Sequence, residues 1–146
     1  MLRVGIIGMS AGNAHPYSWS SIINGEYDGE EITTIGYPGV TAYLDANKDT
    51  LGLPEARVTH VLTQDISISK SIAASSGIEN IAERAEDMIG KVDAVILARD
   101  DAEFHVEMAK PFIEAGIPVF IDKPLAIKQE DLDWFEEQHA AGRFIM

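Results

Sequence analysis

The sequence predicts an α/β domain built on a doubly wound, mostly parallel sheet. Short apolar runs that are typical of buried strands alternate with helical segments along the whole chain. The runs are apolar on both faces, which indicates strands that are covered by helices on two sides. Parallel neighbours joined through helices also imply right-handed crossovers.

The order of the elements follows from the hydrophobic pattern. Apolar or β-branched runs predict strands at residues 3–7, 57–63, 92–98 and 118–121. Helical spacing between proline and glycine boundaries predicts helices at residues 16–24, 67–76, 83–89, 102–115 and 129–141.

Three stretches carry further expectations. Glycines and prolines interrupt residues 26–56, so we expect loops there with one short helix at about 41–48. Pro111 should kink the helix that contains it. Residues 144–146 are predicted to begin another buried strand, and because no polar linker follows them we expect a fragment of a longer protein.

The composition suits one globular domain, which we take to span residues 1–146. The chain is 46% hydrophobic and has a formal net charge of -13, a charge that repels phosphate backbones and anionic lipid. We therefore expect neither a nucleic-acid nor a membrane partner. No segment approaches the roughly 20 apolar residues of a membrane span, and the first residues follow a strand pattern rather than that of a signal peptide. The absence of cysteine excludes disulfides and thiolate metal sites and is consistent with a cytoplasmic protein.

A lysine after the last predicted strand is the first candidate for chemistry. The apolar run from residue 119 ends at Asp122, Lys123 and Pro124. Proline biases the preceding residue toward extended geometry, so Lys123 should lie at the carboxyl edge of the sheet, where open α/β sheets bind ligands. With a neighbouring charge or partial burial, its side chain can orient a hydroxyl and help move its proton.

The loop after the first strand resembles a phosphate-binding turn with substitutions. A dinucleotide fold favours Gly-x-Gly-x-x-Gly, which lets the pyrophosphate approach the backbone and the helix N-terminus. Gly8 fits the first position, whereas Ser10 and Asn13 replace the second and third glycines, and Gly12 lies one residue early. The candidate binding residues are Gly8, Met9, Ser10, Ala11, Gly12 and Asn13. The segment is either a phosphate-binding loop or an ordinary strand-to-helix turn.

Asp65 follows the second predicted strand. A carboxylate there can accept hydrogen bonds from the adenosine ribose and repels a 2′-phosphate, which favours NAD over NADP. Asp65 lies 57 positions after Gly8 (65 minus 8), against about 20 in the simplest fingerprint. The alternative is a solvated carboxylate that caps the next helix.

The segment after the strand at 92–98 offers two further candidates. Arg99, which follows Ala98, either clamps a phosphate or carboxylate or pairs with a nearby aspartate at the surface. His105 falls in the first turns of the next helix, where it is either structural or directed toward the sheet edge. The carboxylates around it suit a helix N-terminus and need no functional cause.

The first helix begins with a histidine and two aromatic residues. His15, Tyr17 and Trp19 either line a substrate or nicotinamide pocket or serve as helix capping and core packing. His60 and His139 lack metal-ligand spacing, so we expect no metal site.

Taken together, these segments resemble the N-terminal domain of the Gfo/Idh/MocA family, which is named for glucose-fructose oxidoreductase, inositol dehydrogenase and a rhizopine-catabolism protein. The likeness covers nearly the whole chain. It is strongest over residues 93–127, where the family's Ala-Gly-strand-Glu-Lys-Pro-Leu-Ala pattern is matched with Asp122 in place of Glu. The resemblance implies a Rossmann fold that binds NAD, with NADP as a possibility, and hydride transfer at a hydroxyl carbon of a sugar or cyclitol. It also implies a homo-oligomer and, after Met146, a second α+β domain that supplies a catalytic acid or base.

The resemblance assigns roles to individual residues. The family's catalytic-motif lysine falls on Lys123, with Asp122 and Pro124 beside it, and we add His105 as a catalytic candidate. The cofactor loop falls on residues 8–14, and the remaining cofactor contacts fall on Asp65, Ala98 and Arg99. The family usually has glycines where Ser10 and Asn13 stand, and Thr-Pro or Ser-Pro where Arg99 stands.

Two rival hypotheses accompany this assignment. One is a non-catalytic relative that senses a nucleotide or sugar after its altered glycine loop has lost tight dinucleotide binding. The other is a doubly wound domain that binds a different phosphate ligand.

Overall fold

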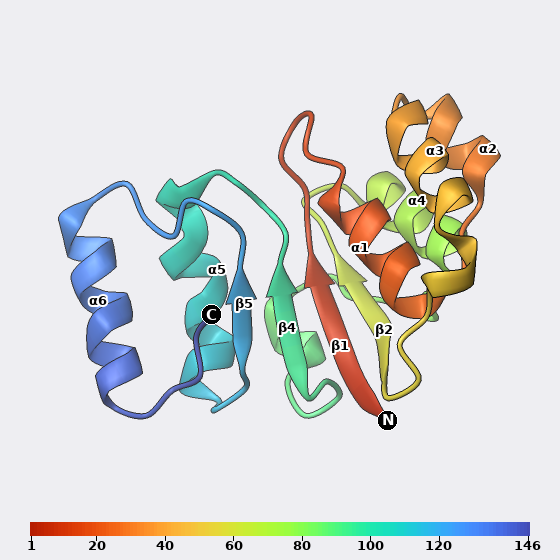
Figure 1. Ribbon diagram of the computed structural model, residues 1–146. Coiled ribbons are helices and arrows are strands. Elements are labelled where there is room, and N and C mark those ends of the chain that lie inside the picture. Colours follow the sequence, from red (N-terminus) through yellow and green to blue (C-terminus); the bar gives the residue numbers. More distant parts are fainter.

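The computed structural model describes all residues, 1–146, and contains one five-stranded parallel sheet (Figure 1). The strands are β1 (Leu2–Ile7), β2 (Ala56–Leu62), β3 (Asn80–Ile81), β4 (Ala94–Leu97) and β5 (Val119–Ile121). Their spatial order is β3-β2-β1-β4-β5, and every neighbouring pair is parallel. The strand order reverses direction between β1 and β4, which confirms the predicted doubly wound fold.

Helices cover both faces of this sheet. They are α1 (His15–Asn24), α2 (Gly29–Thr34), α3 (Pro38–Ala46), α4 (Ile66–Ser76), α5 (His105–Glu114) and α6 (Gln129–Ala140). In one core cluster, the helices α1, α2, α3 and α4 pack against one face of the sheet, and this cluster includes Ile6. In the other cluster, α5 and α6 pack against the opposite face, and this cluster includes Ile7. Neighbouring residues of a strand point to opposite faces, so β1 contributes to both cores.

The helix boundaries follow the predicted signals closely. Pro16 lies in the first turn of α1, where its fixed φ suits a helix and its missing N–H costs nothing. Gly25 and Gly77 follow α1 and α4 in the left-handed conformation, with φ of 70° and 63°. Only glycine adopts this conformation without strain, which explains why both helices end there.

The expectation for residues 26–56 was wrong in part. The segment contains two α-helices, α2 and α3, and a 3₁₀ turn at Lys48–Thr50, rather than one short helix. Asp28 begins α2 by accepting hydrogen bonds from the backbone N–H groups of residues 30 and 31. Ile32 and Leu44 are completely buried, so the two helices extend the core over α4 and the α1 side of the sheet.

Other elements differ in detail from the prediction. The helix expected at 83–89 is a 3₁₀ turn over Ala85–Met88, and the helix expected at 102–115 begins with a 3₁₀ turn over Ala102–Phe104. Pro111 lies inside α5, and the kink expected there stays a prediction. The short strand β3 was not predicted, because two residues are too few to show a periodicity.

Residues 144–146, which were expected to begin a buried strand, pair with β5 only through an isolated bridge. Ile145 forms a parallel bridge with Val119, and the N–H of Ile121 donates to the carbonyl of Met146 at 2.8 Å. The segment is not buried, however, because Phe144 and Met146 are more than half exposed. No helix combines the length and apolar composition needed to cross a membrane.

Candidate functional site

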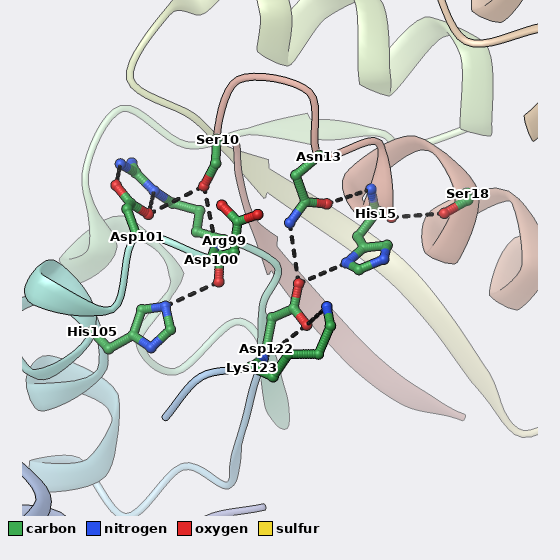
Figure 2. Close-up of polar contacts among 10 residues, drawn as sticks. All are labelled: Ser10, Asn13, His15, Ser18, Arg99, Asp100, Asp101, His105, Asp122 and Lys123. Carbon is green, nitrogen blue, oxygen red and sulfur yellow. Dashed lines mark hydrogen bonds and ion pairs between the residues drawn. The ribbon is translucent and has the colours of Figure 1, made fainter. Parts of the chain in front are cut away.

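Three loops meet at the carboxyl edge of the sheet (Figure 2). They follow β1, β4 and β5, which are neighbours in the sheet and run in the same direction. The side chains that these loops contribute are Ser10, Asn13, His15, Arg99, Asp101, Asp122 and Lys123. Ligands of open α/β sheets bind at this edge, outside the point where the strand order reverses.

The loop after β1 is anchored to the loop after β2. The N–H of Met9 donates to Gln64 Oε1 at 2.9 Å, and Gln64 Nε2 donates to the Met9 carbonyl at 2.5 Å. Farther along, the N–H groups of Ala11 and Gly12 donate to no other group of the protein, and both residues are exposed. Free backbone donors just before a helix N-terminus suit an anionic ligand such as a pyrophosphate.

Ser10 joins the β1 loop to the β4 loop. Its hydroxyl accepts a hydrogen bond from the Asp100 N–H at 3.0 Å and donates to Asp101 Oδ1 at 3.2 Å. Arg99 forms a two-pronged ion pair with Asp101, in which Nε donates to Oδ1 at 2.8 Å. The hydrogen bond from Arg99 is the main cause that lowers the pKa of Asp101. Of the two interpretations of Arg99, the structure agrees with the second, because the guanidinium pairs with the carboxylate of Asp101. Arg99 could bind a phosphate only if this ion pair opened.

Asp122 lies at the centre of the polar network. Its side chain is 4% exposed. Oδ1 accepts hydrogen bonds from the backbone N–H and the Nζ of Lys123, at 2.9 and 3.0 Å. Oδ2 accepts one from Asn13 Nδ2 at 3.1 Å and lies 2.6 Å from His15 Nδ1. The carboxylate therefore has two partners on each oxygen.

These partners determine the ionisation of Asp122. Burial by itself raises the pKa of Asp122, but hydrogen bonds from Lys123, His15 and Asn13 outweigh it and lower the pKa to about 2. The carboxylate is therefore ionised at neutral pH, and it holds the β1 loop against the end of β5.

Asn13 and His15 lie at the start of α1. Asn13 is buried, and its Oδ1 accepts a hydrogen bond from the His15 N–H at 2.9 Å. The His15 ring stacks on Trp19, with ring centroids 4.1 Å apart and an interplanar angle of 10°. Tyr17 is buried in the α1 core instead. Tyr17 therefore packs in the core and also lines the cleft next to α4, whereas His15 faces the Asp122 network.

His105 lies behind the edge rather than on it. Its ring is completely buried, with Nε2 2.9 Å from the Arg99 carbonyl oxygen and Nδ1 3.1 Å from the Leu125 carbonyl oxygen. Both contacts are with backbone, so the ring ties the β4 loop to the segment after β5. We infer a positioning role for it, and a part in the chemistry stays a prediction.

Lys123 is the exposed member of the network. Its side chain is 78% exposed although its Nζ contacts Asp122. Pro124 beside it is also exposed, whereas Ala98 is completely buried and donates its N–H to the Ile7 carbonyl. Ala98 therefore has no exposed atom for a cofactor to contact, and its role in binding stays a prediction, whereas the exposed side chain of Lys123 can reach a cofactor directly.

Asp65 caps α4, as one of the two interpretations proposed. Its Oδ1 accepts hydrogen bonds from the Ser67 N–H at 2.8 Å and the Ser67 hydroxyl at 2.7 Å, and these bonds lower the pKa of Asp65. The contact with a ribose stays a prediction. Beside it is a cleft of about 330 Å³ between the β1 loop, α2 and α4. The cleft is lined by Met9, Tyr17, Glu31, Ile35, Tyr37, Ser67, Ile68 and Ser71.

The predicted site residues share one edge but are spread along it. Asp65 follows β2 and Lys123 follows β5, which lies three strand positions away. At the usual spacing of strands this corresponds to roughly 14 Å. Such a span suits an elongated ligand that runs across the strand ends. No three histidine or carboxylate side chains gather closely enough to hold a metal ion.

Comparison with known proteins places this arrangement in a family. The family model for oxidoreductases with an NAD-binding Rossmann fold, Gfo/Idh/MocA, matches residues 2–140. The chain belongs to the Gfo/Idh/MocA family. It is 38% identical over 85 residues to inositol 2-dehydrogenase 1 of Saccharopolyspora erythraea, a match that covers 56% of the chain and 25% of that relative.

Solved structures similar to this Gfo/Idh/MocA domain include two inositol dehydrogenases. Scyllo-inositol dehydrogenase of Lactobacillus casei with bound NAD(H) and scyllo-inositol superposes with a TM-score of 0.67 and 17% identity, covering 100% of this chain and 35% of that one. Myo-inositol 2-dehydrogenase of Lactobacillus plantarum superposes with a TM-score of 0.65 and 18% identity, covering 96% and 33%. At these identities the likeness establishes the fold, and the chain spans about a third of their length.

Two residues of this candidate site were not among the residues predicted to act. His15 was recognised only as a pocket or capping residue, and Gln64 was not considered. The sequence does place both directly beside strand-end loops, at the start of the first helix and after the second strand. Which strand-end partners they reach depends on the loop paths, and no local pattern encodes that.

The close packing of Gly8 against Pro16 gives a first prediction. A Cβ at this position would lie 2.6 Å from Cγ of Pro16, in a rigid ring at the start of α1. We expect Gly8→Ala to reduce the free energy of unfolding by about 1–3 kcal/mol, because the loop and α1 must separate. Urea denaturation of this domain measures the change. Gly39→Ala is the matched control, since no atom lies within 4 Å of its added Cβ in α3; an equal loss in both variants would contradict the explanation.

Proposed function

We propose that this Gfo/Idh/MocA domain is the NAD-binding part of a dehydrogenase that transfers a hydride to or from a hydroxyl carbon of a sugar or cyclitol. The observation that carries the proposal is the convergence of the β1 loop, the β4 loop and the Asp122–Lys123 pair at one sheet edge. The inositol dehydrogenase relatives support a polyhydroxylated substrate such as inositol.

The binding residues fit a dinucleotide laid across the strand ends. The free N–H groups of Ala11 and Gly12 suit the pyrophosphate, and the ionised Asp65 suits the ribose hydroxyls. The carboxylate of Glu31 lines the adjacent cleft. The carboxylates of Asp65 and Glu31 both lie at the end of the site where the adenosine would bind, and their charges disfavour a 2′-phosphate there. We therefore propose NAD rather than NADP.

Lys123 is positioned for the chemistry in this proposal. NAD, when bound, supplies the redox chemistry by accepting or returning a hydride. The Asp122 carboxylate holds the ammonium of Lys123 at 3.0 Å, while the rest of the side chain remains exposed. From this position the ammonium can donate a hydrogen bond to the reacting hydroxyl and orient it.

One observation favours the alternative of a non-catalytic sensor. Ser10 and Asn13 stand where the fingerprint has glycines, and both side chains contact aspartates of neighbouring loops. These contacts tie the loop down over the ends of β4 and β5. If the loop cannot move, a dinucleotide would bind weakly and the domain would retain only a sensing role.

Calorimetric titration of this domain with NAD and with NADP tests the proposal. We expect NAD to bind about tenfold or more tightly than NADP, because Asp65 and Glu31 repel the additional phosphate. Asp65→Asn is the matched variant: asparagine still caps α4 but has no charge, so the preference for NAD should shrink.

The same titration separates the two candidate functions. Absence of binding by either dinucleotide would contradict the proposed function. Ser10→Gly then shows whether the loop is responsible, because removing the hydroxyl frees the β1 loop from residues 100 and 101. Binding restored in Ser10→Gly would support the sensor with an altered loop.

A further inference from the structure

The segment at residues 26–56 forms one wall of the cleft beside Asp65. This segment, which contains α2 and α3, lengthens the connection between α1 and β2. Glu31 and Ile35 line the cleft from α2 and its end, and Tyr37 lines it from the position before α3. The cleft therefore contains side chains that a direct connection from α1 to β2 would not supply.

The lining of this cleft carries no positive charge. No lysine, arginine or histidine contributes to it, so the cleft does not favour a phosphate. Its polar groups are the carboxylate of Glu31 and hydroxyls such as those of Ser67 and Ser71, and its other side chains are methionine, isoleucine and tyrosine. The volume of about 330 Å³ lies in the range of small-molecule sites, roughly 300–1,000 Å³. Such a cleft suits a flat, uncharged ring that carries hydrogen-bond donors.

Glu31 has an acceptor oxygen without a partner. Its Oε1 accepts a hydrogen bond from the Ser71 hydroxyl at 2.6 Å, and no other group of the protein donates to this carboxylate. The side chain is partly buried. A carboxylate in this setting gains from an N–H donor of a ligand, whereas an acceptor atom of a ligand would be repelled by it.

The cleft adjoins the path that we propose for the dinucleotide. Met9 lines it from the β1 loop, the same loop that offers the free N–H groups of residues 11–12. Ser67 lines it as well, and its N–H and hydroxyl both donate to Asp65. The cleft is thus bordered by the segments that we assign to the pyrophosphate and the ribose. Adenine is the ring attached to that ribose, whereas the nicotinamide belongs with Lys123 at the other end of the sheet edge.

We propose that this cleft binds the adenine ring of the dinucleotide, with Glu31 accepting a hydrogen bond from the amino group of the ring. The inference rests on the proposed function and adds to it an adenine-specific subsite built by the segment of α2 and α3. Met9 and Tyr37 provide surface on which the ring packs. The subsite distinguishes adenine from hypoxanthine, because hypoxanthine has a carbonyl oxygen where adenine has the amino group.

Calorimetric titration of this domain with NAD and with nicotinamide hypoxanthine dinucleotide tests the inference. The two ligands differ only in the purine base, and we expect NAD to bind about tenfold or more tightly. In Glu31→Gln the difference should fall below about threefold, because the amide of glutamine can donate to the carbonyl oxygen of hypoxanthine.

Glu30→Gln is the matched control for this titration. It removes the same charge from an exposed position of α2 that does not line the cleft, so the preference for NAD should be unchanged. Equal affinities of the two ligands for the unmodified domain would overturn the inference and leave the proposed function intact. A preference that persists in Glu31→Gln would overturn it as well.

Nuclear magnetic resonance of this domain locates the base without depending on the affinity for the whole dinucleotide. We expect AMP to shift the backbone amide signals of Met9, Tyr37 and Ser71, and IMP to need about tenfold higher concentration for the same shifts. Shifts confined to other residues, or no shifts at all, would overturn the inference. If neither NAD nor NADP binds, the proposed function is contradicted instead, and the AMP experiment still decides whether the cleft accepts adenine.

Discussion

Lys123→Met is expected to lower kcat of the full-length protein by about 10³-fold, with Kd for NAD changed less than about threefold. Methionine keeps the length of the side chain but has no donor for a substrate hydroxyl. The side chain is 78% exposed, so the substitution should not disturb the core. Steady-state rates with NAD and an inositol, together with calorimetry for NAD, measure the two quantities.

Lys128→Met is the matched control for this prediction. Lys128 is exposed, lies five positions after Lys123 (128 minus 123) and forms no ion pair. The Lys128→Met variant should retain full activity. This result would show that the loss of activity in Lys123→Met does not come from a general change of surface charge. Turnover preserved in Lys123→Met would refute the role of Lys123 in orienting the hydroxyl.

Asp122→Asn is expected to reduce the free energy of unfolding of this domain by about 3 kcal/mol at neutral pH. The carboxylate accepts from two donors on each oxygen, and an asparagine amide group would place its own hydrogens against two of them. The side chain is 4% exposed, so water cannot easily replace the lost partners. Urea denaturation of the variant and the unmodified domain measures the difference.

The same substitution should change the response to acid. The pKa of Asp122 is lowered from 3.8 to about 2 in the folded protein, so its contribution to stability is complete above about pH 4 and is lost as the pH falls through 2. A shift of this size corresponds to about 2 kcal/mol. We expect Asp122→Asn to lack this part of the acid destabilisation between pH 4 and pH 2.

Asp93 provides the comparison for the acid experiment. Hydrogen bonds from Arg3 lower the pKa of Asp93 to about 2 as well, but this pair is exposed and lies at the other end of β1 and β4. Asp93→Asn should leave the contribution of Asp122 intact. An unchanged acid response in Asp122→Asn would show that the buried network does not act as its contacts indicate.

Most of the fold could be predicted because its signals are local. The strand at residues 57–63 and the helix ending at Gly25 are marked by side-chain periodicity and by a left-handed glycine, both of which act over a few residues. The pair α2 and α3 was underestimated because the glycines and prolines in 26–56 were taken as interruptions. In the structure, Gly29 and Pro38 are the first residues of these helices instead.

The candidate site was predictable only in outline. A lysine that follows a buried strand and precedes a proline belongs at the carboxyl edge of a parallel sheet, and Lys123 is found there. The behaviour of Ser10 and Arg99 was not predictable, since each had two chemically sensible partners. The choice of Asp101 by both depends on how the β1 and β4 loops approach each other.

By itself, the sequence determined the parallel α/β fold, the strand ends and the presence of Asp122 and Lys123 at the last of them. These follow from hydrophobic burial and backbone preferences that neighbouring residues establish among themselves. Only the tertiary structure decided that Asn13 and His15, 109 and 107 positions away, share the second oxygen of Asp122. A hydrogen bond requires donor and acceptor to come within about 3 Å, and over such separations the order of the strands and the path of the loops alone control that distance.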